Sequence, residues 1–512
     1  MNTGGFVASA DERATRAGLA VLRSGGNAAD AAIAANAVLA VTAPHLCGLG
    51  GDLFALVYSA GDVRSLVSAG SAGSRSDAAA MRAEGLTSMP LFDDLRPVTV
   101  PGCVDGLVAL HARDGGLPLT ESFAAAIDLA ENGFAASAPL AEAVGRLPAP
   151  ARDALPELAA QAVRAGAMVR RAGVARMLRE VAASGRDAFY RGEFGAGLVA
   201  MPGSTITAAD LVTSSAQWVT ALRTRAWNVD LWVAPPPSQG YLFGASAVLA
   251  DGLELPEPGD PQWAHLLIEC ATATGFDRPQ VLFDGADGDA LLATATGRGR
   301  LVDQRRASSR RLLGAQGDTT YLCVKDADGM AVSLIQSNAS GLGVRIAEPS
   351  TQINLHNRGL GFNLIEGHPA ELRPGRRPPH TLVPAMATDG DGLRAVFGTM
   401  GGDAQPQILL QLAARLFHQG EHPKAAIDAG RWAIRAASGF DTWTADRVQV
   451  AVEGNAPADW AAGLAARGHH VAITPPLNSA FGHAMGIARL PDGSWAAGAD
   501  PRAMIGSAGR TD

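Results

Sequence analysis

The spacing of hydrophobic and polar positions predicts helices first and then a hairpin near the N-terminus. Residues 11–23 place apolar side chains at helical spacing, and the Gly-Gly-Asn sequence that follows is typical of a helix end. Residues 28–41 predict a second, Ala-rich helix with almost no polar face, which we expect to be buried on all sides. Two β-like runs at 53–58 and 63–67 predict a hairpin.

The pattern changes from helix-rich to strand-rich near residue 318. Residues 104–267 are predicted to be mainly helical, including an Ala- and Arg-rich stretch at 140–186. Runs at 320–324 and 330–336 flank an Asp-Gly turn, which is a strong hairpin signal. The remaining predicted elements are strands 382–387 and 393–398, helices 407–418 and 423–436, and strands 448–452, 471–473 and 484–489. This order predicts an α+β layered fold.

Composition and charge narrow the class of protein. Hydrophobic residues make up 47% and charged residues 18% of the 512 positions, so a sizeable core is expected and global disorder is excluded. The net charge of −8 argues against a nucleic-acid-binding protein. No signal peptide is visible, and the most apolar segment, 28–43, is too short to cross a membrane. We therefore expect a cytoplasmic protein with neither nucleic-acid nor membrane partners.

The cysteines and histidines give no sign of a metal centre. The four cysteines are far apart in the sequence and include no CxxC pair, which argues against a zinc site or a disulfide framework. No HExxH motif occurs either. The sequence therefore predicts no metal ligands and no cofactor.

Two short motifs carry candidate chemistry. Thr319 begins a predicted strand, and a threonine that becomes a chain N-terminus carries its own base, because its α-amine has a pKa of about 7.7–8.0. The glycine-rich turn 398–403 follows a strand, and N–H groups in such a turn can stabilise an oxyanion. Taken singly, each motif is also typical of an ordinary strand edge or a glycine turn.

The motifs together resemble the γ-glutamyltranspeptidase family of N-terminal-nucleophile hydrolases, in particular its transpeptidase-like bacterial branch. The resemblance extends over nearly the whole chain and depends on the shared order of short segments. These are Arg23–Ala32, Cys47–Asp52, Val100–Gly102, Ala234–Ser238, Asp318–Thr320, Arg377–Pro378, Met400–Gly402 and Ala499–Arg502.

The resemblance implies a four-layer αββα sandwich and an inactive single-chain precursor. By this resemblance, Thr319 attacks the carbonyl of Asp318 and the chain is cut between them. The products would be a large segment, 1–318, and a small segment, 319–512, that together form one composite fold. The two fragments are expected to stay together as a heterodimer, and further dimerisation is left open.

The resemblance also assigns roles to residues near the cut. Thr319 is implied to form an acyl-enzyme with a small-molecule acyl substrate, and Thr320 to help orient this nucleophile. Gly401 and Gly402 are implied to form the oxyanion hole. Ser337 and Asn338 are implied to lie at the substrate.

Departures from the family pattern bear on the substrate. The arginine that binds the glutamyl carboxylate is missing from 68–74, and Gly361 stands where an aspartate binds the amino group. His380 and Thr381 replace a serine pair. These changes make a non-glutathione acyl group the expected substrate. Arg358, Arg75 and Arg345 are the candidates for binding an acidic substrate group.

The leading interpretation is an autoprocessed threonine amidohydrolase or acyltransferase. One alternative uses the same threonine to hydrolyse a carbon–carbon bond in specialised-metabolite (antibiotic) biosynthesis. The other alternative is an uncleaved, non-catalytic binding protein with this fold.

Overall fold

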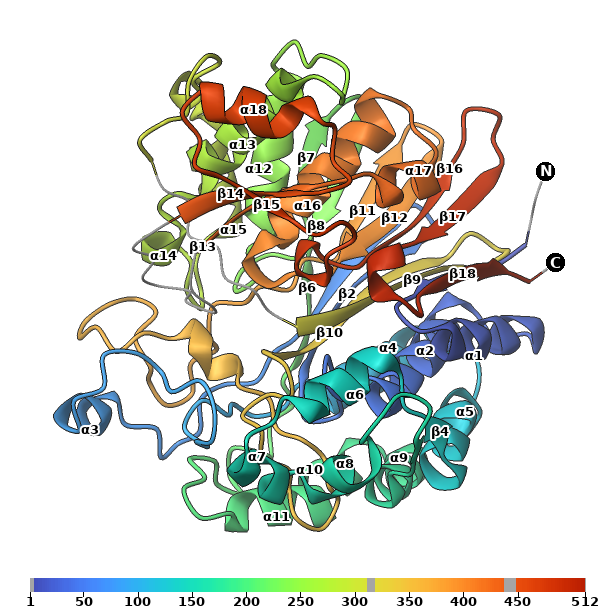
Figure 1. Ribbon diagram of the computed structural model, residues 1–512. Helices are drawn as coiled ribbons and strands as arrows, with labels where there is room; N and C mark the ends of the chain where they lie inside the picture. The colour runs from blue at the N-terminus through green and yellow to red at the C-terminus, as the bar shows by residue number, and fades with distance from the viewer. Residues whose placement is uncertain (1–3, 311–317, 437–447, 512) are drawn as a thin grey trace.

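The computed structural model describes residues 4–310, 318–436 and 448–511. Two antiparallel sheets pack face to face, and helices cover the outer face of each (Figure 1). The expected four-layer αββα sandwich is therefore confirmed.

The first sheet contains the strand that begins at Asp318. Its order is β18-β1-β9-β10-β2-β3-β6, and every neighbouring pair is antiparallel. The bounds are β1 Phe6–Ser9, β2 Asp52–Ser59, β3 Asp62–Ser68, β6 Ala216–Thr220, β9 Asp318–Lys325, β10 Ala331–Ala339 and β18 Ser507–Arg510. Strands from both sides of residue 318 thus form one sheet.

Helices α1 (Glu12–Arg23), α2 (Ala28–Thr42) and α4 (Cys103–Asp114) cover this sheet. All 15 residues of α2 are buried, as its lack of a polar face predicts, because α1 and α5 (Leu119–Asn132) cover its other sides. The α2 N-terminus is tied to the β9–β10 turn, since Ala28 N–H donates to the Asp326 carboxylate at 3.0 Å. Smaller elements complete this half: α3 Ala78–Ala83, β4 Phe134–Ala135, α6 Ala138–Gly145, α7 Ala149–Ala154, α8 Pro156–Gln161, β5 Met168–Val169, α9 Ala172–Ser184, α10 Arg186–Tyr190 and α11 Glu193–Ala200.

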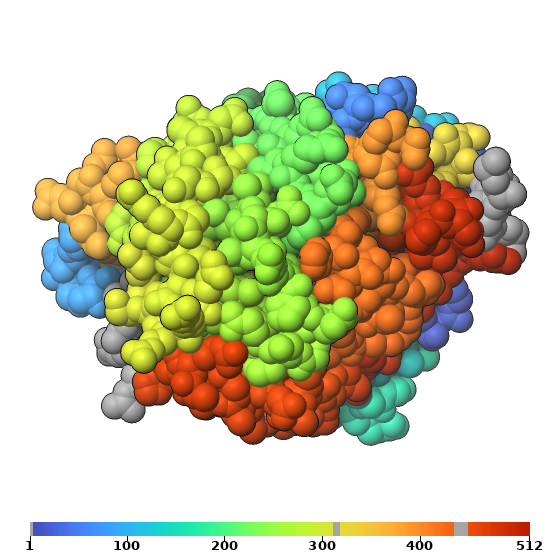
Figure 2. All heavy atoms as spheres, turned by 90° about the horizontal axis from the view of Figure 1, so that it is seen from above, coloured from blue at the N-terminus to red at the C-terminus, as the bar shows by residue number. Residues whose placement is uncertain are grey.

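The second sheet has the order β17-β16-β12-β11-β8-β7 and is also antiparallel. Its strands are β7 Leu222–Ala226, β8 Val229–Val233, β11 Ala385–Asp389, β12 Gly392–Thr399, β16 Ala484–Arg489 and β17 Trp495–Ala499. The helices around it are α12 Gly240–Asp251, α13 Pro261–Gly275, α14 Arg278–Val281, α15 Gly288–Thr296, α16 Gln405–Ala413 and α17 Pro423–Asp428. Figure 2 shows this outer layer from above.

A third, smaller sheet corrects one sequence prediction. The helix expected at 423–436 ends at Asp428, and β13 (Trp432–Ala436) follows it. β13 pairs with β14 (Val448–Glu453), which pairs with β15 (Val471–Thr474) beside α18 (Asp459–Ala466). Burial of Trp432 and Ile434 in the second core outweighs the helix-like pattern of the preceding turn. The mainly helical interpretation of 104–267 also missed β6, β7 and β8.

Two further expectations concern cysteines and membranes. All four cysteines are buried and free. Within the described ranges, no helix has both the length and the apolar character that crossing a membrane would need.

Candidate active site

The site forms where strands β9, β10 and β2 meet at one end of the first sheet. Gln336 pairs with Thr320 and Ala339 with Asp318, so two residues of β10, Ser337 and Asn338, stand opposite the single residue Thr319. Such a bulge re-aims the side chains of the longer strand. Gly317, which precedes the Asp-Thr-Thr motif, lies outside the described residues.

Ser337 links Thr319 to the peptide bond that precedes it. Thr319 Oγ1 donates to Ser337 Oγ at 3.1 Å, and Ser337 Oγ donates to the Asp318 carbonyl oxygen at 2.8 Å. Thr319 and Ser337 are both buried. The hydroxyl of Ser337 therefore polarises the carbonyl of the bond that the resemblance marks for cleavage.

Arg358 completes this cluster from the short helix η2 (Arg358–Gly361). Its Nη2 donates to Ser337 Oγ at 3.1 Å and its Nη1 to Thr381 Oγ1 at 3.2 Å. Burial lowers the pKa of Arg358 to about 10, which leaves it charged at neutral pH. The structure thus brings Thr319, Ser337, Arg358 and Thr381 together, with the positive charge of Arg358 at the hydroxyls of Ser337 and Thr381.

Asp52, which sequence reasoning did not single out as a site residue, anchors the far side of Arg358. Its Oδ2 lies 4.0 Å from Arg358 Nε and 3.2 Å from His380 Nε2. Burial lowers the pKa of His380 to about 3, so its ring is neutral, and its Nε2–H donates a hydrogen bond to Asp52 Oδ2. Burial by itself would raise the pKa of Asp52. The contacts with His356, His380 and Arg358 have the larger combined effect and keep this pKa below its usual value. His380 is therefore connected to Arg358 through Asp52.

Other predicted site residues lie less directly at Thr319. Thr320 Oγ1 donates to the Gln336 carbonyl at 3.4 Å, and the Asn338 amide donates to the Pro44 carbonyl at 3.2 Å. Among the acidic-group candidates, Arg75 is exposed and Arg345 lies over the ring of Phe92. The structure gives neither of them the hydrogen bonds to Ser337 and Thr381 that Arg358 makes.

The glycine turn follows β12 of the second sheet, which faces β9. β9 packs on β12, and a Cβ atom on Gly398 would lie 2.2 Å from the ring of Tyr321, which therefore occupies that space. Side chains two apart on a strand share a face, so Thr319 points into the same interface as Tyr321. Gly401 and Gly402 have φ angles of 139° and 57°, which favour glycine, and they precede α16.

A cavity of about 260 Å³ adjoins Asp318. Its lining includes His45, Ser479 and His483, and the backbone carbonyl of His483 accepts a hydrogen bond from Met400 N–H. The cavity therefore extends from Asp318 toward the segment that supports the glycine turn.

Two glycines at the departures from the family pattern, Gly70 within 68–74 and Gly361, have no room for a side chain. A Cβ atom on Gly70 would lie 1.6 Å from the Val100 carbonyl oxygen, and one on Gly361 would lie 2.3 Å from that of Pro379. Arginine and aspartate side chains therefore do not fit at these two positions. The packing of the backbone around Gly70 and Gly361 is therefore consistent with glycine, and not with the larger residues of the family pattern.

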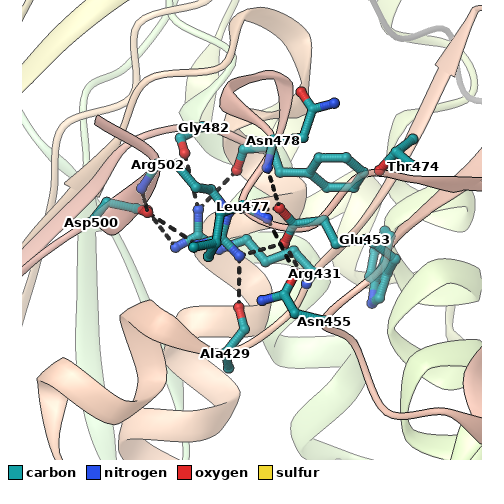
Figure 3. A network of polar contacts seen from close by, with 12 residues as sticks. Ala429, Arg431, Glu453, Asn455, Thr474, Leu477, Asn478, Gly482, Asp500 and Arg502 are labelled. Carbon is teal, nitrogen blue, oxygen red and sulfur yellow. Dashed lines mark hydrogen bonds and ion pairs between the residues drawn. The ribbon is translucent and has the colours of Figure 1, made fainter. Parts of the chain in front are cut away.

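A buried ion network contacts Gly482, which packs against the glycine turn; Figure 3 shows Arg431, Glu453, Asp500 and Arg502 of this network together with Gly482. Arg431 and Arg502 both contact the Asp500 carboxylate, at 2.7 and 3.0 Å, and Arg502 also pairs with Glu453. Arg431 Nη1 donates to the Gly482 carbonyl at 3.2 Å, and a Cβ atom on Gly482 would lie 2.4 Å from the Met400 carbonyl oxygen. The network thus holds the segment on which residues 400–402 rest.

Asp500→Asn is expected to reduce the free energy of unfolding by about 3–5 kcal/mol, because two buried guanidinium groups lose their shared carboxylate. Arg431 and Arg502 overcome the effect of burial and depress the pKa of Asp500. Its contribution is therefore present above the ordinary pKa and is lost as the pH falls through the depressed value. Urea unfolding at neutral pH tests this, with exposed Asp492→Asn as the control; a loss below about 1 kcal/mol would contradict it.

Comparisons with known proteins show the family of the chain. The family model described as Gamma-glutamyltranspeptidase matches residues 14–509. The chain is 33% identical to the oxamate amidohydrolase proenzyme of Klebsiella pneumoniae, over 99% of both chains, and 32% identical to the glutathione hydrolase-like YwrD proenzyme of Bacillus subtilis, over 97% of both. The crystal structure of cephalosporin acylase from Bacillus halodurans superposes with a TM-score of 0.89 at 32% identity, covering 99% of this chain and 95% of that one. The chain therefore belongs to the gamma-glutamyltranspeptidase family and is an enzyme of its hydrolase and acylase group.

Proposed function

We propose that the chain is a proenzyme that cuts itself before Thr319 and then hydrolyses amides through an acyl-enzyme on that threonine. The observation that carries this proposal is the chain of hydrogen bonds from Thr319 Oγ1 through Ser337 Oγ to the Asp318 carbonyl. It joins the proposed nucleophile to the bond that it would attack.

Processing requires no group beyond this cluster and water. Thr319 Oγ1 attacks the Asp318 carbonyl carbon while Ser337 stabilises the developing charge on the oxygen. The C–N bond breaks, the nitrogen takes up a proton, and an ester joins Asp318 to the Thr319 side chain. Water then hydrolyses the ester, which leaves a carboxylate on Asp318 and a free α-amine on Thr319. The large segment, 1–318, and the small segment, 319–512, remain together as a heterodimer.

The new α-amine then acts as the general base in catalysis. With an ordinary pKa of about 7.7–8.0 it takes the Thr319 hydroxyl proton near neutral pH. Attack on the substrate amide expels an amine and leaves an acyl ester. The N–H groups of Gly401 and Gly402 stabilise the oxyanion, and water releases the acid. Thr320 and Asn338 support this site through their strand contacts.

We propose a short acyl group that carries a carboxylate as the substrate. Arg358 places a positive charge at Ser337 and Thr381, within reach of a substrate bound at Thr319. The closed positions at Gly70 and Gly361 argue against a bound γ-glutamyl group. The relative named for oxamate, an amide next to a carboxylate, supports this substrate class. The relatives' amide-hydrolase names and the intact Thr319 cluster also favour this function over carbon–carbon cleavage or a non-catalytic scaffold.

The test combines mass and activity. The purified wild-type protein is expected to give two polypeptides in a denaturing mass measurement, one of them starting at Thr319. It should release ammonia from oxamate faster than from its neutral methyl ester. Two fragments with no preference for the carboxylate would refute the substrate class alone, and an intact chain would refute the proposed processing.

Ser337→Ala is expected to slow processing by about a hundredfold, because the Asp318 carbonyl loses its hydroxyl donor. The measurement is the half-time for conversion of freshly folded precursor, followed by mass. Ser340→Ala, three positions further along, is the matched control. Equal half-times for the two variants would remove Ser337 from the processing step.

A further inference from the structure

Two histidines and a glutamate converge where α13 meets the segment after α18. His265 Nδ1 and His469 Nε2 lie 2.8 Å apart, and a Glu269 carboxylate oxygen joins them, with the three ligand atoms all within 4.8 Å of one another. Glu269 follows His265 by one helical turn, so both lie on one face of α13. α13 and α18 pack together near the top of Figure 1.

The carboxylate of Glu269 in this cluster is hydrogen-bonded through only one of its two oxygens among the described residues. Glu269 is 2% exposed, and the Ser308 N–H donates to its Oε1 at 3.1 Å. Its Oε2 is buried and finds no hydrogen-bond partner among the described residues. A buried carboxylate oxygen without a partner costs free energy, and a bound cation would offset that cost.

The hydrogen bonding of the His265 ring is typical of a metal-binding histidine. His265 Nε2 lies 2.9 Å from the Asp303 carbonyl oxygen, which can only accept, so this nitrogen carries the proton. Its Nδ1 therefore presents a lone pair toward His469. Metal-ligating histidines are commonly fixed in this way by a backbone carbonyl behind the ring.

The surrounding charges permit a cation. Burial lowers the pKa of His265, and it lowers that of His469 to about 4, so both rings are neutral at neutral pH. Burial raises the pKa of Glu269, so a cation that binds it would displace any proton it holds. Arg467 is the nearby positive group, and its side chain is engaged with Gln262 and the Gly463 carbonyl.

We propose that His265 Nδ1, His469 Nε2 and a Glu269 oxygen bind a zinc-class divalent cation, with water as a further ligand. Two imidazoles and a carboxylate suit Zn²⁺ or Co²⁺ and not Mg²⁺ or Ca²⁺. At Zn–N distances of about 2.1 Å in a tetrahedron, the two nitrogens would stand about 3.4 Å apart. The partly exposed His469 side chain can move outward to reach this spacing, with its proton shifted to Nδ1.

This cation would join two distant parts of the chain. His265 and Glu269 precede residue 318 and His469 follows it, so the metal would tie the large and small segments together. Figure 2 shows the yellow-green region that includes α13 against the orange-red C-terminal region on this face. The site itself does not depend on cleavage.

The test uses untagged full-length protein, treated with chelator and then titrated with Co²⁺. We expect one equivalent of Co²⁺ per chain, with the strong visible absorption of four- or five-coordinate Co²⁺, and displacement by Zn²⁺. His469→Gln and Glu269→Gln should each weaken binding at least tenfold. His470→Gln, the exposed neighbour, should bind like the wild type.

A thermal scan gives a second readout. Zn²⁺ should raise the unfolding temperature of the wild type and of His470→Gln, and should not raise that of His469→Gln. The metal-free unfolding temperature of each variant shows whether it folds. Absence of a stoichiometric Co²⁺ spectrum in the wild type would overturn the proposal, as would equal binding by His469→Gln.

Discussion

Thr319→Ala is expected to leave a single 512-residue chain with no amidohydrolase activity. The variant lacks the hydroxyl that would attack the Asp318 carbonyl, so neither the ester nor the free α-amine can form. Thr319 is buried, and the smaller alanine fits in its place, so strand β9 is expected to form in the variant. A denaturing mass measurement after prolonged incubation checks the chain length, and ammonia release checks the activity.

Thr319→Ser is the matched control, since it retains the hydroxyl. It should give the same two fragments and measurable turnover. Fragments that still appear in Thr319→Ala would show that another group or a contaminating protease makes the cut. The assignment of Thr319 as the nucleophile would then be wrong.

Arg358→Met is expected to lower kcat/KM for a carboxylate-bearing amide by at least about a hundredfold. The guanidinium donates charge-assisted hydrogen bonds to Ser337 and Thr381, and such bonds contribute about 1.5–3 kcal/mol each. Methionine fills similar space without either donor. Steady-state kinetics on processed enzyme measure the loss.

Stability and substrate recognition need separate readouts at this position. Loss of Arg358 removes a cationic partner of the buried Asp52 and leaves it neutral histidines and the N–H groups of Gly70 and Gly102, which is expected to reduce the free energy of unfolding by about 3–5 kcal/mol. Arg358→Lys keeps the charge but not the fork geometry, so it should retain more stability than activity. Equal losses on the charged amide and its neutral ester would assign Arg358 to the support of Ser337 and not to the substrate. Full activity of Arg358→Met would contradict both roles.

Local patterns in the sequence predict many of the helices and strands that the structure contains. The α2 helix and the β2–β3 and β9–β10 hairpins follow from periodicity and turn residues. Each of the strands β6 to β8 has only five residues, which gives a weak local signal, and β6 and β8 pair with β3 and β11, which lie far away in the sequence. The β13 strand was missed because its partner, β14, follows a further segment of chain.

The candidate site divides in a similar way. Thr319, Ser337 and Arg358 were accessible through motif order, and the structure brings them together. Asp52 lies in a glycine-rich loop motif, and its contact with His380 spans 328 positions, so no local signal marks it. The same reason explains the cluster at Glu269, whose partner His469 lies 200 residues away from it in the sequence.

In the strand order β18-β1-β9, the first strand of the chain lies beside β9, which begins the Asp-Thr-Thr motif, and the last strand lies beside the first. Gly5 and Thr511 exchange hydrogen bonds at 3.0 Å, and Figure 1 shows the two termini side by side. A short linker could therefore join them without disturbing the sheet, and the chain could be reopened at residue 319. Such a circular permutant would begin with Thr319 once its initiator methionine is removed. It would carry a free α-amine from synthesis, so that chemistry on substrate could be studied apart from self-cleavage.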